Sequence, residues 1–155
     1  MKRGFLRAWL PVLIWVGIIF SMSTDAGSAE ETGGILEPLL RWIWPVISQD
    51  SIEWCHFIIR KCGHLSEYAM LAFLAWRALE KPYLSKIPVF SLKLAAKAWL
   101  IATVYAATDE FHQIFVPSRT ASVGDVMIDS TGALIGLLLV SGIQGLRRRR
   151  TISLP

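Results

Sequence analysis

Hydrophobic and polar positions in this chain separate into long blocks. Four apolar stretches approach the length of about 20 residues that crosses a bilayer; they are residues 6–22, 61–79, 94–115 and 123–143. Trp99–Ala107 and Gly132–Val140 are apolar all round, whereas a surface helix of a soluble protein keeps a polar face. The pattern predicts an all-α bundle of four transmembrane helices in a single domain, residues 1–155.

The long connection between the first two stretches has two parts. Residues 25–34 (DAGSAEETGG) are small and acidic and predict a flexible hinge. Residues 35–47 are too short to span but contain Trp42, Trp44 and Pro45, and residues 52–60 continue the same mixture. Because tryptophan favours the membrane–water interface, we expect an amphipathic segment in the headgroup layer between spans one and two.

Composition supports a membrane protein, with 54% hydrophobic and 18% charged residues and a mean hydropathy of +0.47. The net charge of +4 comes from basic residues that flank the apolar stretches: Lys2, Arg3 and Arg7, then Lys81, Lys86, Lys93 and Lys97, then Arg147, Arg148, Arg149 and Arg150. This is the positive-inside pattern of membrane proteins, not a stripe that would follow nucleic acid. It predicts a multi-pass protein of the cytoplasmic membrane with both termini in the cytoplasm and no nucleic-acid partner.

The first stretch also has the features of a secretory signal. A basic start, an apolar run and Gly27-Ser28-Ala29 resemble such a signal with its cleavage site. Retention of this segment predicts four spans, and cleavage predicts three.

Ionisable and polar residues return at one end of the last three stretches. They are Lys61, His64, Glu67 and Tyr68 on the second, Asp109, Glu110, His112 and Gln113 on the third, and Asp125 and Asp129 on the fourth. At about 100° per residue, those of the second stretch share one face of a helix. Gly132 and Gly136 extend the stripe of the fourth and allow close helix approach. Charges are costly in hydrocarbon and by default mark a functional site. By the predicted topology these ends of the three spans lie toward the outer leaflet, so we expect one site that opens there.

These residues also form a recognisable signature. The pattern is Lys61-x-x-His64-x-x-Glu67-Tyr68, then Asp109-Glu110-x-x-Gln113, then Pro117-x-Arg119, Asp125 and Gly132. The chain resembles the VanZ-like family of small membrane proteins, whose namesake is associated with resistance to the lipoglycopeptide teicoplanin. The family usually has glycine and asparagine where this chain has Ser118 and Asp129.

The residues favour chemistry on an anionic headgroup. Arg119 would clamp phosphate or carboxylate beside Lys61, and His64 would act as general base or nucleophile, oriented by Glu67 or Asp109. Glu110 and Asp125 complete the candidate catalytic set, and the candidate substrate-binding set is Tyr68, Gln113, Ser118, Arg119 and Asp129. The expected partner is a membrane lipid or lipid-linked envelope molecule that enters laterally.

Four alternatives stay open at this stage. No cofactor is required, although a divalent metal has nitrogen and oxygen ligands available in His64, Glu67, Asp109, Glu110, His112 and Asp125. The same charges also suit a structural ion-pair network, a non-catalytic binder of a headgroup or an amphiphilic glycopeptide, or a small transporter. An enzyme would lose turnover but keep ligand affinity in His64→Ala, whereas a binder has no turnover to lose.

Overall fold

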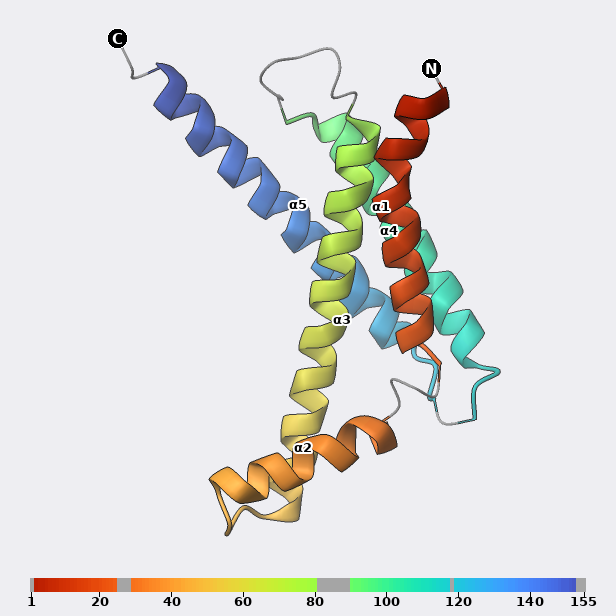
Figure 1. Cartoon of the computed structure of the whole chain (residues 1–155), viewed down its shortest axis with the longest axis vertical. Coiled ribbons are helices and arrows are strands. Elements are labelled where there is room, and N and C mark those ends of the chain that lie inside the picture. The colour runs from red at the N-terminus through yellow and green to blue at the C-terminus, as the bar shows by residue number, and fades with distance from the viewer. Residues whose placement is uncertain (1, 25–28, 81–89, 118, 153–155) are drawn as a thin grey trace.

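The computed structural model describes residues 2–24, 29–80, 90–117 and 119–152. Within these ranges the chain is entirely helical in its regular structure, which confirms the all-α prediction. The helices are α1 (Lys2–Met22), α2 (Ala29–Ile43), α3 (Gln49–Leu79), α4 (Leu92–Gln113) and α5 (Val123–Ile152). Figure 1 shows α3 at the centre, where it packs against α1, α4 and α5.

Two helices are long and apolar enough to cross a membrane, over Gly4–Met22 in α1 and Val123–Leu146 in α5. Together with the apolar composition they indicate a membrane protein. In α3 and α4, ionisable residues are interleaved with the apolar ones. The predicted stretches 61–79 and 94–115 are therefore confirmed as helical but not as membrane spans. The C-terminal ends of α1 and α4 and the N-terminal end of α5 lie at one end of the bundle (Figure 1).

Helix α3 begins earlier than the sequence pattern predicts. Its 31 residues form one continuous helix about 46 Å long at 1.5 Å per residue, so the expected break between residues 52–60 and a span starting at Lys61 is wrong. Ser48 caps the helix, because its hydroxyl accepts a hydrogen bond from the backbone N–H of Ser51 at 3.3 Å. The N-terminal part of α3 therefore extends beyond the bundle (Figure 1).

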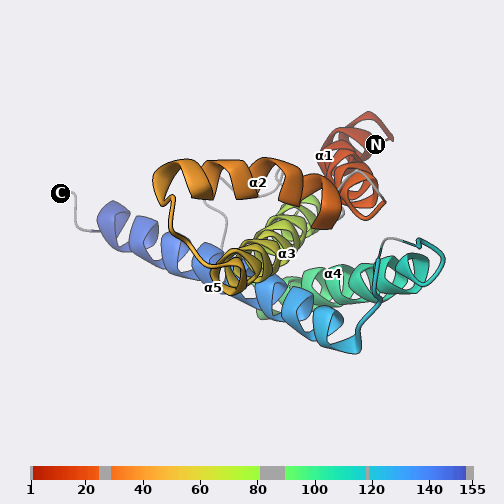
Figure 2. The same cartoon turned by 90° about the horizontal axis from the view of Figure 1, so that it is seen from below.

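Helix α2 lies across this extension of α3, on the side away from α4 and α5 (Figures 1 and 2). It begins at Ala29, so the flexible hinge predicted for residues 25–34 is wrong over 29–34, and residues 25–28 lie outside the described ranges. Trp42 and Trp44 are 80% and 62% exposed. The expected amphipathic segment is thus a helix with exposed tryptophans at and just after its C-terminal end.

Small residues bring the helices of the bundle close together. Alanines fill the core, with Ala72, Ala98 and Ala133 fully buried. Gly132 and Gly136 of α5 face the backbone of α3, where an added Cβ would lie 2.3 Å and 2.5 Å from the carbonyl oxygens of Leu65 and Ala69. Close packing through small residues is the usual basis of helix association in membranes. Here it fixes α5 against the part of α3 that contains His64.

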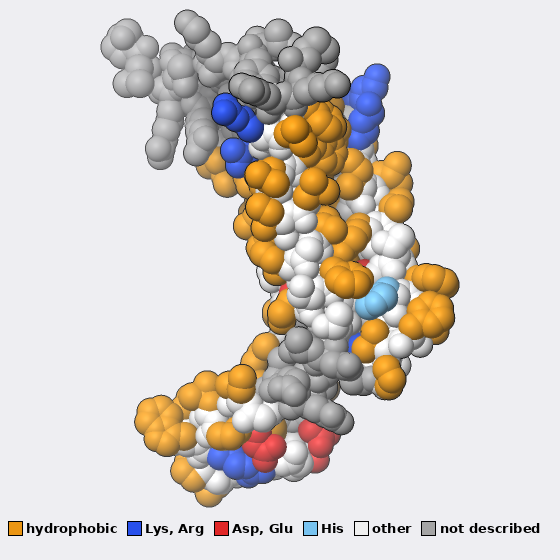
Figure 3. Space-filling model, turned by 45° about the vertical axis from the view of Figure 1, so that its right-hand side comes forward, with side chains coloured by type: hydrophobic (Ala, Val, Ile, Leu, Met, Phe, Trp, Pro, Cys, Tyr) orange, Lys and Arg blue, Asp and Glu red, His pale blue; other side chains and the backbone are white. Residues whose placement is uncertain are grey.

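Large apolar side chains cover the outside of the bundle. Leu10, Leu13, Leu100, Leu138 and Leu139 are all more than half exposed. Figure 3 shows hydrophobic side chains over one such face, with Lys and Arg at its upper end. An apolar surface of this extent suits contact with lipid.

Candidate functional site

A cavity of about 160 Å³ lies where α1 and α4 end beside the middle of α3. We call it the His64 cavity. Its lining comes from α1, α3, α4 and the loop before α5, and consists of Ile19, Met22, Ser23, Ile59, Arg60, Gly63, His64, Glu67, Asp109, Gln113 and Arg119. Residues far apart in the sequence therefore meet at one point, among them His64, Glu67, Asp109, Gln113 and Arg119 of the predicted set.

His64 is paired with an acid of α5. Its Nδ1 lies 3.1 Å from Oδ1 of Asp129, which is fully buried. The expectation that Glu67 or Asp109 orients the imidazole is wrong, because the close approach of α5 to α3 at Gly132 brings Asp129 nearer. A carboxylate bonded to one ring nitrogen fixes the orientation of the ring and leaves Nε2 for a ligand. Asp129 thus supports His64 without lining the cavity.

Lys61 pairs with Asp125, one helical turn along the same interface. The lysine side chain is 18% exposed and that of the aspartate 6%. Neither residue lines the His64 cavity, whereas Arg119 does. The ion pair joins α3 to α5, and this part of the structural-network alternative is present in the fold.

Asp109 and Gln113 are one turn apart on α4 and face α1. The side-chain amide of Gln113 donates to Ser23 Oγ at 3.0 Å and to Asp109 Oδ2 at 3.3 Å. Asp109 is 4% exposed, and its Oδ1 has no hydrogen-bond partner among the described residues. Asp109 lines the cavity, but this oxygen is itself buried and is not an accessible acceptor for a ligand.

Arg119 ties the end of α1 to the loop before α5. Its guanidinium donates to the carbonyl oxygens of Met22 and Thr24, the latter at 3.0 Å and 3.2 Å. A cation at the C-terminal end of a helix satisfies open carbonyls and the helix dipole. Arg119 therefore closes one side of the cavity.

Three further predicted residues lie outside the cavity lining. Glu110 is buried and accepts from the backbone N–H of Ser122 at 2.7 Å, so it holds the start of α5. Tyr68 is fully buried, with its ring 6.3 Å from that of Tyr105. The ring of His112 lies 4.7 Å from that of Phe20, tilted by 40°. Ser118 lies outside the described residues.

The metal alternative depends on how these ligands converge. In the described part of the chain, no three side chains of His, Cys, Asp or Glu form a group suited to a metal ion. Asp125 pairs with Lys61 and Asp129 with His64, while Glu110 accepts a hydrogen bond from the backbone of Ser122. The convergence is instead one of a histidine, two arginines and two carboxylates around the cavity.

Arg60 and Ser23 were not predicted to belong to the site. Arg60 precedes Lys61 by one residue and lies one turn before His64, a spacing that places it on the face of His64. Ser23 follows the apolar run of α1, two residues after Ser21. Both signals are present in the sequence, but they become specific only once α1 is known to end at the cavity.

Sequence comparison agrees with the signature of these residues. The sequence model of the VanZ/LLP1 family matches residues 8–144, which include every residue of the His64 cavity. No curated protein and no solved structure matches the chain at a significant level. The match extends over most of the chain, and the chain belongs to the VanZ/LLP1 family.

Proposed function

We propose that this protein spans the cytoplasmic membrane four times, with both termini in the cytoplasm, and that the His64 cavity faces the outer leaflet. The arrangement of helix ends supports this proposal, because the N-terminal end of α1, the C-terminal ends of α3 and α5 and the N-terminal end of α4 share one end of the bundle (Figure 1). The basic groups of the sequence lie at or near these ends. The His64 cavity lies toward the opposite end.

In this proposal the cavity binds the headgroup of an envelope lipid or lipid-linked precursor, and His64 accepts a proton from a headgroup hydroxyl or a water. The pairing of His64 with buried Asp129 carries the proposal. A histidine whose Nδ1 is held by a carboxylate is a suitable general base at its other nitrogen. As His64 lines a cavity, a ligand in that cavity would meet this nitrogen.

The charges around the cavity suit an anionic headgroup with a hydrogen-bond donor. Arg60 and Arg119 supply positive charge from two sides, and guanidinium groups bind phosphate through paired hydrogen bonds. The carboxylate of Glu67, which also lines the cavity and is only partly buried, would accept a hydrogen bond from a hydroxyl or an ammonium group. A phosphate ester with a polar substituent satisfies both requirements.

Binding without chemistry is the second candidate. The observation in its favour is that Ser23, the hydroxyl side chain of the cavity lining, already accepts a hydrogen bond from Gln113 and is not paired with His64. A binder of lipid headgroups or amphiphilic glycopeptides would fit the teicoplanin association of the family's namesake as well as an enzyme would.

The experiment uses the full chain in nanodiscs that contain phosphatidylglycerol and phosphatidylethanolamine, with farnesyl phosphate as the lipid-linked probe. Binding is measured by native mass spectrometry and turnover by phosphorus NMR. The enzyme proposal expects His64→Ala to abolish turnover while farnesyl phosphate still binds, and expects the lipid-facing control Ile58→Ala, half-exposed on α3, to behave as wild type.

Each outcome has a distinct meaning. Binding without turnover in the wild type, lost in Arg60→Gln, would support the binder and overturn the enzyme. Failure of the wild type to bind any of these lipids above the level of an unrelated membrane protein would contradict both.

A further inference from the structure

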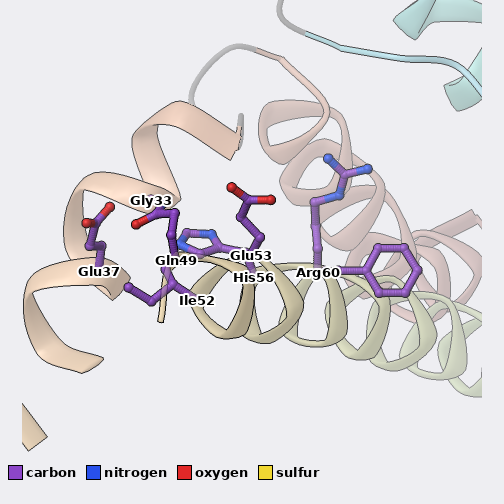
Figure 4. Close-up of a pocket in the computed structure, with 8 residues that line it drawn as sticks. Gly33, Glu37, Gln49, Ile52, Glu53, His56 and Arg60 are labelled. Carbon is purple, nitrogen blue, oxygen red and sulfur yellow. The ribbon is translucent and has the colours of Figure 1, made fainter. Parts of the chain in front are cut away.

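A second and larger cavity lies between α2 and the N-terminal part of α3, outside the bundle. Its volume is about 370 Å³, within the range of small-ligand sites. We call it the α2–α3 cleft; its polar and aromatic lining comprises Glu37, Gln49, Glu53, His56, Phe57 and Arg60. Figure 4 shows Glu53 and Arg60 extending from the same side of α3.

The cleft and the His64 cavity share a wall. Arg60 lines both. In the cleft, Gln49, Glu53, His56 and Arg60 are spaced three or four apart, as are Arg60, His64 and Glu67, so these residues lie on one face of a continuous helix. From Glu53 to His64 this face is about 16 Å long. A ligand that contacts Arg60 from the His64 cavity is therefore next to a residue that also lines the cleft.

The polar groups of the cleft are held in place by a residue beside it. Arg41 of α2 donates to Glu37 at 2.9 Å and to Oε1 of Gln49 at 2.8 Å. This contact joins α2 to the start of α3 and leaves the amide N–H groups of Gln49 available as donors. Gly33 lets α2 approach His56, whose Cε1 would lie 3.3 Å from an added Cβ.

Glu53 contributes a carboxylate without an ion-pair partner among the described residues. The apolar side chain of Ile52 lines the cleft beside it. Carboxylate, amide and imidazole groups around an apolar patch are suited to a ring that has hydroxyls at its edge and C–H bonds on its face. This is the chemistry of a saccharide.

We propose that the α2–α3 cleft binds the sugar of a phosphate-linked saccharide lipid, whose phosphate lies at Arg60 and whose ester linkage lies in the His64 cavity. This inference rests on the proposed function and names its substrate class. Length favours a glycosyl phosphate over a phosphoethanolamine headgroup, because the shorter headgroup, once bound at His64, would end before Glu53. The position of the cleft beyond the bundle is where a sugar would project from a membrane lipid.

The test compares three probes with the full chain in nanodiscs: farnesyl phosphate, farnesyl phosphoglucose and glucose 1-phosphate. We expect the wild type to bind farnesyl phosphoglucose at least about tenfold more tightly than farnesyl phosphate. Glu53→Ala should reduce this ratio to about two or less. The matched control is Asp50→Ala, which removes a carboxylate from the same end of α3 but does not line the cleft. Phe57→Leu is a second cleft variant for the case that Glu53→Ala fails to fold.

Equal affinity for the two farnesyl probes in the wild type would overturn the inference, as would a ratio that both cleft variants leave unchanged. If farnesyl phosphate binds but its glucosyl ester has no advantage, only the saccharide inference fails. If neither lipid binds, the proposed function fails with it. Binding of glucose 1-phosphate as tight as that of the farnesyl ester would support the sugar site and overturn its lipid source.

Discussion

The replacement Gly132→Ala tests whether the contact of α5 with α3 maintains the site. The added Cβ would lie 2.3 Å from the carbonyl oxygen of Leu65, whereas ordinary contact begins at 3.4 Å. The obstruction is backbone, so the helices must separate by about 1 Å in a close-packed interior. His64 and Asp129 flank this contact, with Nδ1 of the histidine 3.1 Å from Oδ1 of the aspartate. A helix separation of about 1 Å would take these two atoms out of hydrogen-bond range.

The contributions to the free energy of unfolding sum to a net destabilisation. Overpacking costs about 1–3 kcal/mol, and the lost bond to a charged group about 1.5–3 kcal/mol. The higher helix propensity of alanine relative to glycine offsets about 1 kcal/mol of this cost. We expect a net destabilisation of about 2–4 kcal/mol, which lowers Tm by about 5–15 °C for a chain of this size.

Thermal unfolding in detergent measures this difference, with Gly142→Ala as the matched control on the same helix. An added Cβ at Gly142 meets nothing within 4 Å, so this variant should be as stable as wild type or slightly more so. A Tm for Gly132→Ala no lower than that of Gly142→Ala would refute the packing argument.

Three further predictions address the ion pair, the loop arginine and the topology. Lys61→Met should destabilise the protein by about 3–5 kcal/mol, because it strands the Asp125 carboxylate; in chemical denaturation the double variant Lys61→Met/Asp125→Leu should recover most of this loss, and no recovery would argue against the pair. Arg119→Ala should speed hydrogen exchange at the backbone N–H groups of Ser23 and Thr24, because the helix end frays once the carbonyls of Met22 and Thr24 lose the guanidinium, and unchanged exchange would remove its proposed role at the end of α1. In sealed cells, an external thiol reagent should label a cysteine at Ser28 but not at Ser85 or Thr151, and labelling at Ser85 would reverse the proposed orientation.

The sequence predicts helices best where a long apolar run defines them. The predicted starts at residues 94 and 123 lie close to the helix starts at Leu92 and Val123, whereas α5 continues to Ile152, nine residues past the predicted end at residue 143. Hydropathy alone does not predict that α3 continues back to Gln49, because residues 49–60 mix charged and aromatic side chains. A local cap at Ser48 favours the longer helix, as does the packing of α2 against α3, and only the second contact depends on tertiary structure.

The candidate site follows the same division. Helical spacing correctly places His64 and Glu67 on one face of α3, and Asp109 and Gln113 on one face of α4. The partner of His64 depends on the rotation and depth of α5, which helical spacing within one segment does not define. Asp129 consequently takes the orienting role expected of Glu67 or Asp109.

The density inside the His64 cavity of an experimental structure in lipid nanodiscs tests the central claim most directly. We expect a phosphate within hydrogen-bond distance of Arg60 and a donor group of the same ligand on the Glu67 carboxylate, beside His64. A cavity that contains only water in the presence of saturating farnesyl phosphate, with the His64–Asp129 pair unchanged, would contradict it.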